Sequence, residues 1–328
     1  MRVVINQNLG KIAEYIKLND DFLIASHINA DGDAIASALV IGSILKSLNK
    51  NYTIILNEHP QDKYRYLTNI DDIQIYDDVS QTKYYNVITV DVPNLSRIAN
   101  VREYVAEDAF IINIDHHGDN ASFGNINEVY NASSTAEITY NLIKEMDVPI
   151  TRDIAEMIYT GIIYDTGMFR FSITTELSFI IAAEMLRIGA RVDKIAEQIF
   201  YEKDLETMKL LSHILNGATF HEDGKIGVIS VAKKERNNNS SKKPEMDDFI
   251  NYLMMTKGVE VGVFFMEMQT DYFRISFRAK NDFDVRNVAM AFSGGGHRKA
   301  AGCRMKGRLN DVKKKVLAEV KNQLLNAT

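Results

Sequence analysis

The chain of 328 residues contains a single cysteine, Cys303. One thiol excludes an internal disulfide framework and any zinc site built from several cysteines, and it predicts a reducing, cytoplasmic setting. The chain also lacks any apolar run near the ~20 residues that span a bilayer, so no membrane partner is expected. Residues 1–20 mix apolar and charged side chains, which predicts an amphipathic helix and not a signal peptide.

Stripes of interleaved basic and aromatic side chains are also lacking, and the net charge is −6. Such a chain is poorly suited to gripping long nucleic acid through its phosphates, so no long nucleic-acid partner is expected. The charge is unevenly distributed, because residues 274–328 contain 13 Lys and Arg against 4 Asp and Glu. This asymmetry predicts two lobes with different electrostatic roles. The run Lys313, Lys314, Lys315 is more simply explained as the solvated face of a helix.

Short apolar runs alternate with helical patterns in the first half of the chain. We predict strands over residues 21–26, 52–56, 86–90 and 110–114, and helices over 33–48 and 152–164. This alternation is typical of a parallel α/β sheet. Ser134 and Thr135, followed by Glu137, predict a capped helix start.

The second half changes character, and the length of the chain itself predicts two domains. Residues 175–213 are mostly helical in pattern. Strands are then predicted at 224–231, 259–268, 273–279 and 302–305, helices at 284–292 and 309–325, and a polar loop at 237–243. We therefore expect a parallel-sheet domain over residues 1–190, a helical linker over 191–215, and a smaller α/β domain over 216–328.

Metal-capable side chains follow three of the four predicted strands of the first half: His27, Asp91 and Asp115. The carboxyl ends of parallel strands meet in one crevice where the strand order reverses, so these residues should be neighbours in space. Further candidate metal ligands for this crevice lie in three short segments: the loop from His27 to Asp33, Asp115-His116-His117 and Asp165-Thr166-Gly167. Singly, the loop can be an Asx-turn with Asp33 capping a helix, and Asp165 can be the end of a glycine-capped helix.

The number of candidate ligands indicates the kind of metal site. Four carboxylates and two imidazoles are too many for one tetrahedral zinc ion, and they suit two ions that share a bridging carboxylate. The mixed donor set without thiolate is compatible with manganese, and also with iron, cobalt or zinc. Two such ions suit the chemistry of phosphate transfer. The six candidates are His27, Asp31, Asp33, Asp91, His116 and Asp165.

The basic second domain offers groups that bind phosphate. A glycine run lets backbone N–H groups approach an anion closely, and two arginines four residues apart on one strand share a face. Alternatively, the glycine run is a plain structural turn. The predicted phosphate-binding residues are Arg274, Arg278, Gly294, Gly295, Gly296, His297 and Arg298.

These motifs resemble the DHH phosphoesterases, a family named for the Asp-His-His seen here at residues 115–117. The resemblance covers nearly the whole chain: His27-x3-Asp31-x-Asp33, Asp91 within Val90–Asn94, Asp165 within Gly161–Phe169, and Gly294–His297 with Ala300–Gly302 match in the expected order. The length and the two-domain layout are similar to the nano-RNase and pAp-phosphatase branch. Ala30, Ala36 and Ser293 depart from the usual Pro, Gly and Gly of the family, and none of the three is a ligand.

The resemblance implies dependence on two divalent ions, most often manganese, and it assigns roles. One ion would be held by His27, Asp31 and Asp91, and the other by Asp33, Asp91, His116 and Asp165. His117, Asp115 and Asp91 would be the catalytic residues, with Asp115 orienting its neighbours and His117 facing the scissile phosphate.

The expected activity is hydrolysis of very short oligonucleotides or linear dinucleotides (nanoRNA, pApA) to mononucleotides, and also of pAp to AMP. Inorganic pyrophosphatase and cyclic-dinucleotide phosphodiesterase remain alternatives, as do a long-DNA exonuclease and a nucleotide-binding regulator without catalysis. The expected partner is a short nucleotide, and a homodimer is left open as an expectation.

Overall fold

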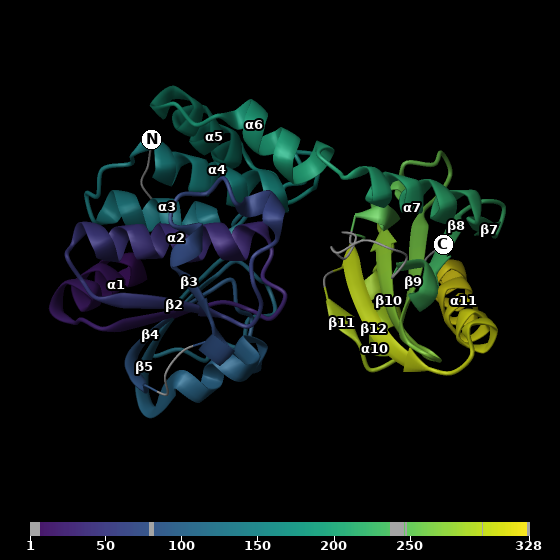
Figure 1. Ribbon diagram of the computed structural model, residues 1–328, viewed down its shortest axis with the longest axis horizontal. Helices are drawn as coiled ribbons and strands as arrows, with labels where there is room; N and C mark the ends of the chain where they lie inside the picture. Colours follow the sequence, from purple (N-terminus) through teal and green to yellow (C-terminus); the bar gives the residue numbers. More distant parts are fainter. Residues whose placement is uncertain (1–6, 79–81, 237–245, 247, 297, 327–328) are drawn as a thin grey trace. The chain divides into compact units, whose positions relative to one another are not determined.

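The computed structural model describes residues 7–78, 82–236, 246, 248–296 and 298–326, and they fall into two compact units, Met1–Glu202 and Lys203–Thr328 (Figure 1). The first unit contains α1 (Gln7–Leu18), β1 (Phe22–Ala25), α2 (Gly32–Ser47), β2 (Tyr52–Leu56), β3 (Ile73–Ile75), β4 (Tyr84–Val90), β5 (Val105–Asp115), β6 (Ile126–Val129), α3 (Thr135–Glu145), α4 (Arg152–Asp165), α5 (Glu176–Ile188) and α6 (Val192–Ala196). The second contains α7 (Leu205–Asn216), β7 (Thr219–His221), β8 (Ile226–Val231), α8 (Lys233–Arg236), α9 (Phe249–Met254), β9 (Val261–Gln269), β10 (Tyr272–Ala279), α10 (Val285–Met290), β11 (Gly295–Gly296), β12 (Ala300–Lys306) and α11 (Leu309–Asn326).

The first sheet has the order β3-β2-β1-β4-β5-β6, and every pairing in it is parallel. The chain moves outward from β1 toward β3 and then, from β4, outward in the other direction. The order therefore reverses between β1 and β4, which is where a parallel α/β sheet opens a crevice at its carboxyl edge. The predicted fold class is confirmed. The structure has two short strands, β3 and β6, that were not predicted from the sequence.

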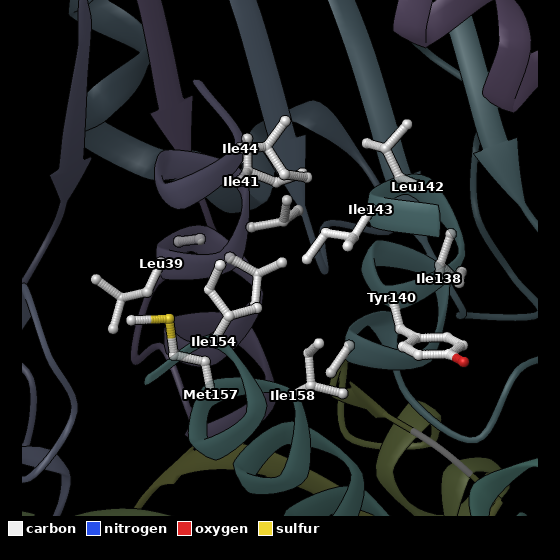
Figure 2. Packing of buried hydrophobic residues seen from close by; sticks show 14 of the residues in the cluster. Leu39, Ile41, Ile44, Ile138, Tyr140, Leu142, Ile143, Ile154, Met157 and Ile158 are labelled. Atoms are coloured by element: carbon white, nitrogen blue, oxygen red, sulfur yellow. The ribbon is translucent and has the colours of Figure 1, made fainter. Parts of the chain in front are cut away.

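Two cores cover the faces of this sheet. On one face, β-branched and leucine side chains of α2, α3 and α4 pack against one another, as Figure 2 shows for Leu39, Ile143 and Ile158. On the other face, the 3-10 segment Leu95–Tyr104 covers Leu23, Ile55 and Val87. Because both faces are covered, the central strand β1 (FLIA) is buried along its whole length.

The second unit is built on a mixed sheet of order β11-β12-β10-β9-β8-β7, in which only β8 and β9 pair in parallel. Phe273, Ile275 and Phe277 of β10 point into a core that α10 and α11 cover. Helices α7 and α9 pack on the opposite face, against β8 and β9.

The predicted linker over residues 191–215 is divided between the two units. Ile195 of α6 and Ile199 are buried in the core of the first unit, whereas Leu211 and Ile214 of α7 are buried in the second. The alternative that the glycine run is a plain structural turn is wrong for Gly295 and Gly296, because these residues form the edge strand β11 opposite Gly302 and Ala301. The polar loop predicted at 237–243 lies outside the described residues.

In the part of the chain that the structure describes, we find no helix that combines the length and the apolar character needed to cross a bilayer.

An ion pair between a buried glutamate and a half-exposed arginine joins α4 to the start of α6. Glu156 of α4 accepts hydrogen bonds from the guanidinium of Arg191 at 2.6 and 2.7 Å, and its side chain is 3% exposed. The hydrogen bond from Arg191 lowers the pKa of Glu156, and burial opposes this shift only in part. A carboxyl whose pKa is lowered by folding stabilises the protein above its unfolded pKa of about 4.3, and this contribution is lost as the pH falls through the folded value.

We therefore expect Glu156→Gln to reduce the free energy of unfolding by about 2 kcal/mol at pH 7, the usual value for hydrogen bonds to a buried charge. The difference from the wild-type protein should shrink as the pH is lowered to 3. Urea unfolding at the two pH values measures this. Glu197→Gln, which breaks an exposed ion pair with Lys194 at 2.8 Å, is the control and should change stability by less than about 0.5 kcal/mol. A pH-independent effect of Glu156→Gln would contradict the linkage.

Candidate metal centre

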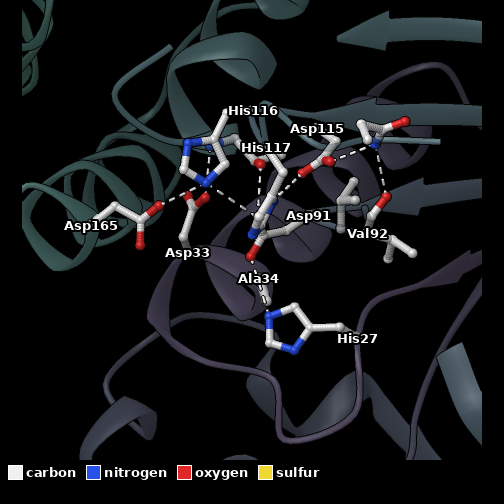
Figure 3. Close-up of polar contacts among 12 residues, drawn as sticks. His27, Asp33, Ala34, Asp91, Val92, Asp115, His116, His117 and Asp165 are labelled. Carbon is white, nitrogen blue, oxygen red and sulfur yellow. Dashed lines mark hydrogen bonds and ion pairs between the residues drawn. The ribbon is translucent and has the colours of Figure 1, made fainter. Parts of the chain in front are cut away.

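The carboxyl edge of the first sheet gathers all six predicted ligands. His27 follows β1, Asp91 follows β4, and His116 follows β5, while α2 carries Asp33 and α4 ends at Asp165 (Figure 3). Three groups of side chains have ligand atoms within 4.8 Å of one another: His27, Asp31 and Asp91; Asp33, His116 and Asp165; and Asp91, His116 and His117. Chain segments up to 138 positions apart thus meet in one cluster.

Asp91 belongs to two of these groups and links His27 to His116. Its Oδ2 lies 3.3 Å from Nε2 of His27, and its Oδ1 lies 3.5 Å from Nε2 of His116. The two carboxylate oxygens thus face two different imidazoles, which is the arrangement of a carboxylate that can bridge two ions. Asp91 has a left-handed backbone, with φ of 59°, and this conformation costs about 1–3 kcal/mol for a residue other than glycine.

The imidazoles are oriented by their other nitrogens. Nδ1 of His27 lies 3.0 Å from the carbonyl oxygen of Ile28, and Nδ1 of His116 lies 3.3 Å from that of Ala132. With Nδ1–H donating to a carbonyl, Nε2 keeps its lone pair, and a histidine that binds a metal is usually held in this way. In both residues Nε2 is the atom that points at the carboxylates.

Asp33 is positioned by a helix on another segment of the chain. Its Oδ2 accepts a hydrogen bond from the backbone N–H of Thr135 at 2.6 Å, and its Oδ1 accepts one from Ala136 at 2.9 Å. Asp31, not Asp33, caps α2, because its side chain accepts from the N–H groups of Asp33 and Ala34. The capping alternative for Asp33 is therefore wrong, and its carboxylate is turned toward the cluster.

Thr135 and Asn120 also belong to the site, although the sequence pattern does not predict them there. The hydroxyl of Thr135 donates to Oδ1 of Asp91 at 3.1 Å. The amide of Asn120 donates to Oδ2 of Asp115 at 2.5 Å, and Nδ1 of His117 lies 2.6 Å from Oδ1 of the same carboxylate. The sequence around Thr135 indicates only the start of a helix, and no sequence pattern marks Asn120 as a site residue. Asp115 is fully buried and holds His117 without facing the ligand cluster itself.

We expect Asp115→Asn to lower the rate of phosphoester hydrolysis about 10–100-fold, the usual effect of losing a partner that orients a functional histidine. An amide at this position cannot accept from both His117 and Asn120. The change should fall on kcat more than on KM, and steady-state kinetics measure it. Asp119→Asn, at an exposed position of the same loop, should leave the kinetics unchanged. Equal losses in the two variants would exclude the orienting role.

Bound protons offset the negative charge of the clustered carboxylates, because the pKa values of several side chains are raised. Burial lowers the pKa of His27, but the hydrogen bond and charge of Asp91 outweigh it and raise the value to about 9. Burial, followed by the charges of Asp91 and Asp165, raises the pKa of Asp31 to about 6. The pKa of Asp91 is lowered, because the histidines around it outweigh its burial. The residues fit divalent cations, whose binding would release these protons.

The predicted phosphate-binding residues lie in the second unit. Arg274 and Arg278 are on the same face of β10, the one opposite the phenylalanines. Arg298 donates to the carbonyl of Asp282 at 2.8 Å, so it also stabilises a turn. A Cβ at Gly294 would lie 2.2 Å from the carbonyl oxygen of Gly302, whereas none of the described atoms lies within 4 Å of one at Gly295. His297 lies outside the described residues.

Comparison with known proteins gives matches over most of the chain. The model of the DHH family N-terminal domain matches residues 21–162, and the DHHA1 domain matches residues 223–325. The chain is 29% identical over 326 residues to the bifunctional oligoribonuclease and PAP phosphatase NrnA of Thermus thermophilus, covering 98% of this chain and 96% of that protein. The protein of the same name from Bacillus subtilis is 28% identical, with 88% and 90% covered. The crystal structure of an exopolyphosphatase-related protein from Bacteroides fragilis aligns over 100% of both chains, with a TM-score of 0.92 and 27% identity.

Proposed function

From the premise that this chain belongs to the DHH family and is a hydrolase of phosphate ester bonds, we propose that it is a manganese-dependent phosphoesterase of very short nucleotides. The substrates are oligonucleotides of a few residues and linear dinucleotides such as pApA, cleaved to mononucleotides, and pAp, hydrolysed to AMP. The names of the relatives from Thermus thermophilus and Bacillus subtilis support this choice of substrates. The observation that carries the proposal is that the two carboxylate oxygens of Asp91 face two different imidazoles, those of His27 and His116.

The fit of the cluster to two ions supports the proposed cofactor. His27, Asp31 and Asp91 would hold one ion, and Asp33, Asp91, His116 and Asp165 the other. The ligand atoms of the first set lie within 4.8 Å of one another, and so do those of Asp33, His116 and Asp165. Asp91 adjoins this second group through Oδ1, which lies 3.5 Å from Nε2 of His116. Two bound ions would lower the pKa of the attacking water and neutralise charge on the phosphate oxygens. Carboxylate and imidazole donors without thiolate suit manganese.

The residues of the chain supply orientation and proton control. Asp115 accepts from Nδ1–H of His117. Burial lowers the pKa of His117, but the hydrogen bond to Asp115 and the charge of Asp91 outweigh it and raise the value. The protonated ring can then donate from Nε2 to a non-bridging oxygen or to the leaving oxygen of the phosphate. Thr135 holds Asp91 through a hydrogen bond to Oδ1. Asp33 is held by two backbone N–H groups, which limits the reorganisation needed when substrate binds. In the second unit, we propose that Arg274, Arg278, Arg298, His297 and the tract Gly294–Gly296 bind the phosphates of the substrate.

A panel of substrates tests the proposal. We expect the wild-type protein with Mn²⁺ to hydrolyse pApA, tri- to pentanucleotides and pAp at least ~10-fold faster, in kcat/KM, than RNA of 20 or more residues, cyclic di-AMP or pyrophosphate. A chelator should abolish all turnover. Fastest turnover of pyrophosphate or of cyclic di-AMP would favour one of the alternative phosphatases. Tight binding of a dinucleotide without turnover would favour a regulator. A cytoplasmic location and a homodimer stay predictions.

A further inference from the structure

Two aromatic side chains lie beside the ligand cluster of the first unit. The ring of Tyr164, the residue before the ligand Asp165, packs so close to the backbone of Gly32 that a Cβ there would lie 2.7 Å from Cδ2 of the ring. Gly32 is itself between two of the proposed ligands in the chain. Phe200 lies near the same ring, with the two ring centroids 6.5 Å apart and the ring planes 25° from parallel. The pair therefore borders segments that supply ligands to both proposed ions.

The faces of these two rings are only partly covered. Another pair of the same unit, Tyr15 and Phe110, has ring centroids 4.1 Å apart and planes 12° from parallel, so each of those rings covers the other. At 6.5 Å the rings of Tyr164 and Phe200 do not cover each other in this way, and both side chains are half-buried. Aromatic surface that a planar group can contact therefore remains next to the ligand cluster.

The surroundings hold the two rings in place. Tyr64 is fully buried and meets Tyr164 edge-on, with ring centroids 6.4 Å apart and planes at 64°. The ammonium of Lys63 lies 5.2 Å from the ring centroid of Tyr64 and 5.7 Å from that of Tyr164, within the range of cation–π attraction. Phe200 is on the π-helical turn Glu197–Tyr201, and such turns are rare and occur often at functional sites. The rings are thus positioned before a ligand binds, and Lys63 adds a positive charge that suits an anionic nucleotide.

We infer that Tyr164 and Phe200 form a nucleobase subsite, which stacks one base of the nucleotide whose phosphate lies at the ligand cluster. The inference rests on the proposed function and deepens it, since it names the part of the substrate that the first unit recognises. Stacking on aromatic rings is tolerant of sequence, because every base has a π-face. The subsite therefore favours nucleotides over pyrophosphate and over sugar phosphates, without selecting one particular base.

Binding of two monophosphates tests the inference, because AMP carries an adenine where ribose 5-phosphate has a hydroxyl. Calorimetric titration with each ligand in the presence of Mn²⁺ gives two dissociation constants. The wild-type protein should bind AMP about tenfold more tightly, which corresponds to about 1.4 kcal/mol and lies in the range for stacking of one base. Phe200→Leu and Tyr164→Leu should each weaken the binding of AMP about fivefold. The binding of ribose 5-phosphate should stay within twofold of wild type.

Variants that keep an aromatic ring separate stacking from packing. Phe200→Tyr and Tyr164→Phe should bind AMP within twofold of wild type. Phe110→Leu is the matched control, because it breaks the closely stacked pair with Tyr15 in the same unit. It should change neither dissociation constant.

Three results would overturn the subsite. The first is equal affinity of the wild-type protein for AMP and ribose 5-phosphate, the second is unchanged binding of AMP in both leucine variants, and the third is an equal loss for the two ligands. Because Tyr164 and Phe200 are on separate segments, one leucine variant remains informative if the other unfolds. Hydrolysis of pApA by the wild-type protein with Mn²⁺ is assayed separately, so a failure of the proposed activity is distinguishable from a failure of the subsite.

Discussion

Asp91→Ala is expected to lower the rate of phosphoester hydrolysis at least ~10³-fold, which corresponds to about 4 kcal/mol of lost transition-state stabilisation. The physical reason is that one carboxylate faces both imidazoles, His27 through Oδ2 and His116 through Oδ1. Its removal takes a ligand from each proposed ion, and it leaves His27 without the carboxylate that raises its pKa against the effect of burial. Steady-state kinetics with Mn²⁺ and calorimetric titration of Mn²⁺ measure the two effects.

The backbone of Asp91 calls for a specific control. Its φ of 59° is in the left-handed region, where alanine is less favourable than aspartate, so the substitution also destabilises the loop by about 1 kcal/mol. Asp147 has φ of 53° and is exposed on another segment. Asp147→Ala should therefore reproduce the loss of stability and keep full activity. Substantial hydrolysis by Asp91→Ala in excess Mn²⁺ would contradict the shared-ligand assignment.

Gly161→Ala is expected to reduce both the stability of the protein and its metal affinity, although a helix intrinsically favours alanine over glycine. In an open helix, the change from glycine to alanine stabilises by about 1 kcal/mol. At Gly161, however, a Cβ would lie 2.4 Å from Cβ of Ala136 and 2.5 Å from Oδ1 of Asp33. The methyl group must push α3 and α4 apart or displace Asp33. We expect the free energy of unfolding to fall by about 2 kcal/mol, as is usual for overpacking.

Metal affinity should fall about 10–100-fold in the same variant, because Asp33 loses its alignment with the N–H groups of Thr135 and Ala136. Thermal unfolding and titration of Mn²⁺ provide the two readouts. Gly10→Ala in α1 is the control, since the nearest atom to its added Cβ is 3.7 Å away. It should leave metal binding unchanged and stabilise the protein by about 0.5–1 kcal/mol. Unchanged metal affinity in Gly161→Ala would show that Asp33 does not depend on this close approach.

The sequence predicted the edge of the first sheet well because that edge is set by short-range patterns. Apolar runs before His27, Asp91 and Asp115 predicted the strands, and the reversal of strand order places the carboxyl ends together. Strands β3 and β6 have only three and four residues. Their identity depends on pairing with β2 and β5, which a local pattern does not reveal.

The contacts that hold the site were harder to predict. The hydrogen bond from Thr135 to Asp33 joins residues 102 positions apart, and its existence depends on how α3 packs against α2. The glycines at 294–296 are typical of a turn, but Gly295 and Gly296 pair with β12 as an edge strand. The chain runs so close to β12 there that Gly294 has no room for a side chain. In both cases tertiary packing decides the outcome, and neighbours in sequence do not.

The ligand cluster has a consequence for how the chain is held together. The groups that face one another belong to four separate segments, around residues 27–33, 91, 116 and 165, in a protein whose single thiol can form no internal covalent tie. Cations bound there would act as non-covalent cross-links between distant segments, and would close long loops as a disulfide closes the loop between its cysteines. Stripping them would therefore loosen the whole carboxyl edge of the sheet, and unfolding of the first unit should begin at that edge.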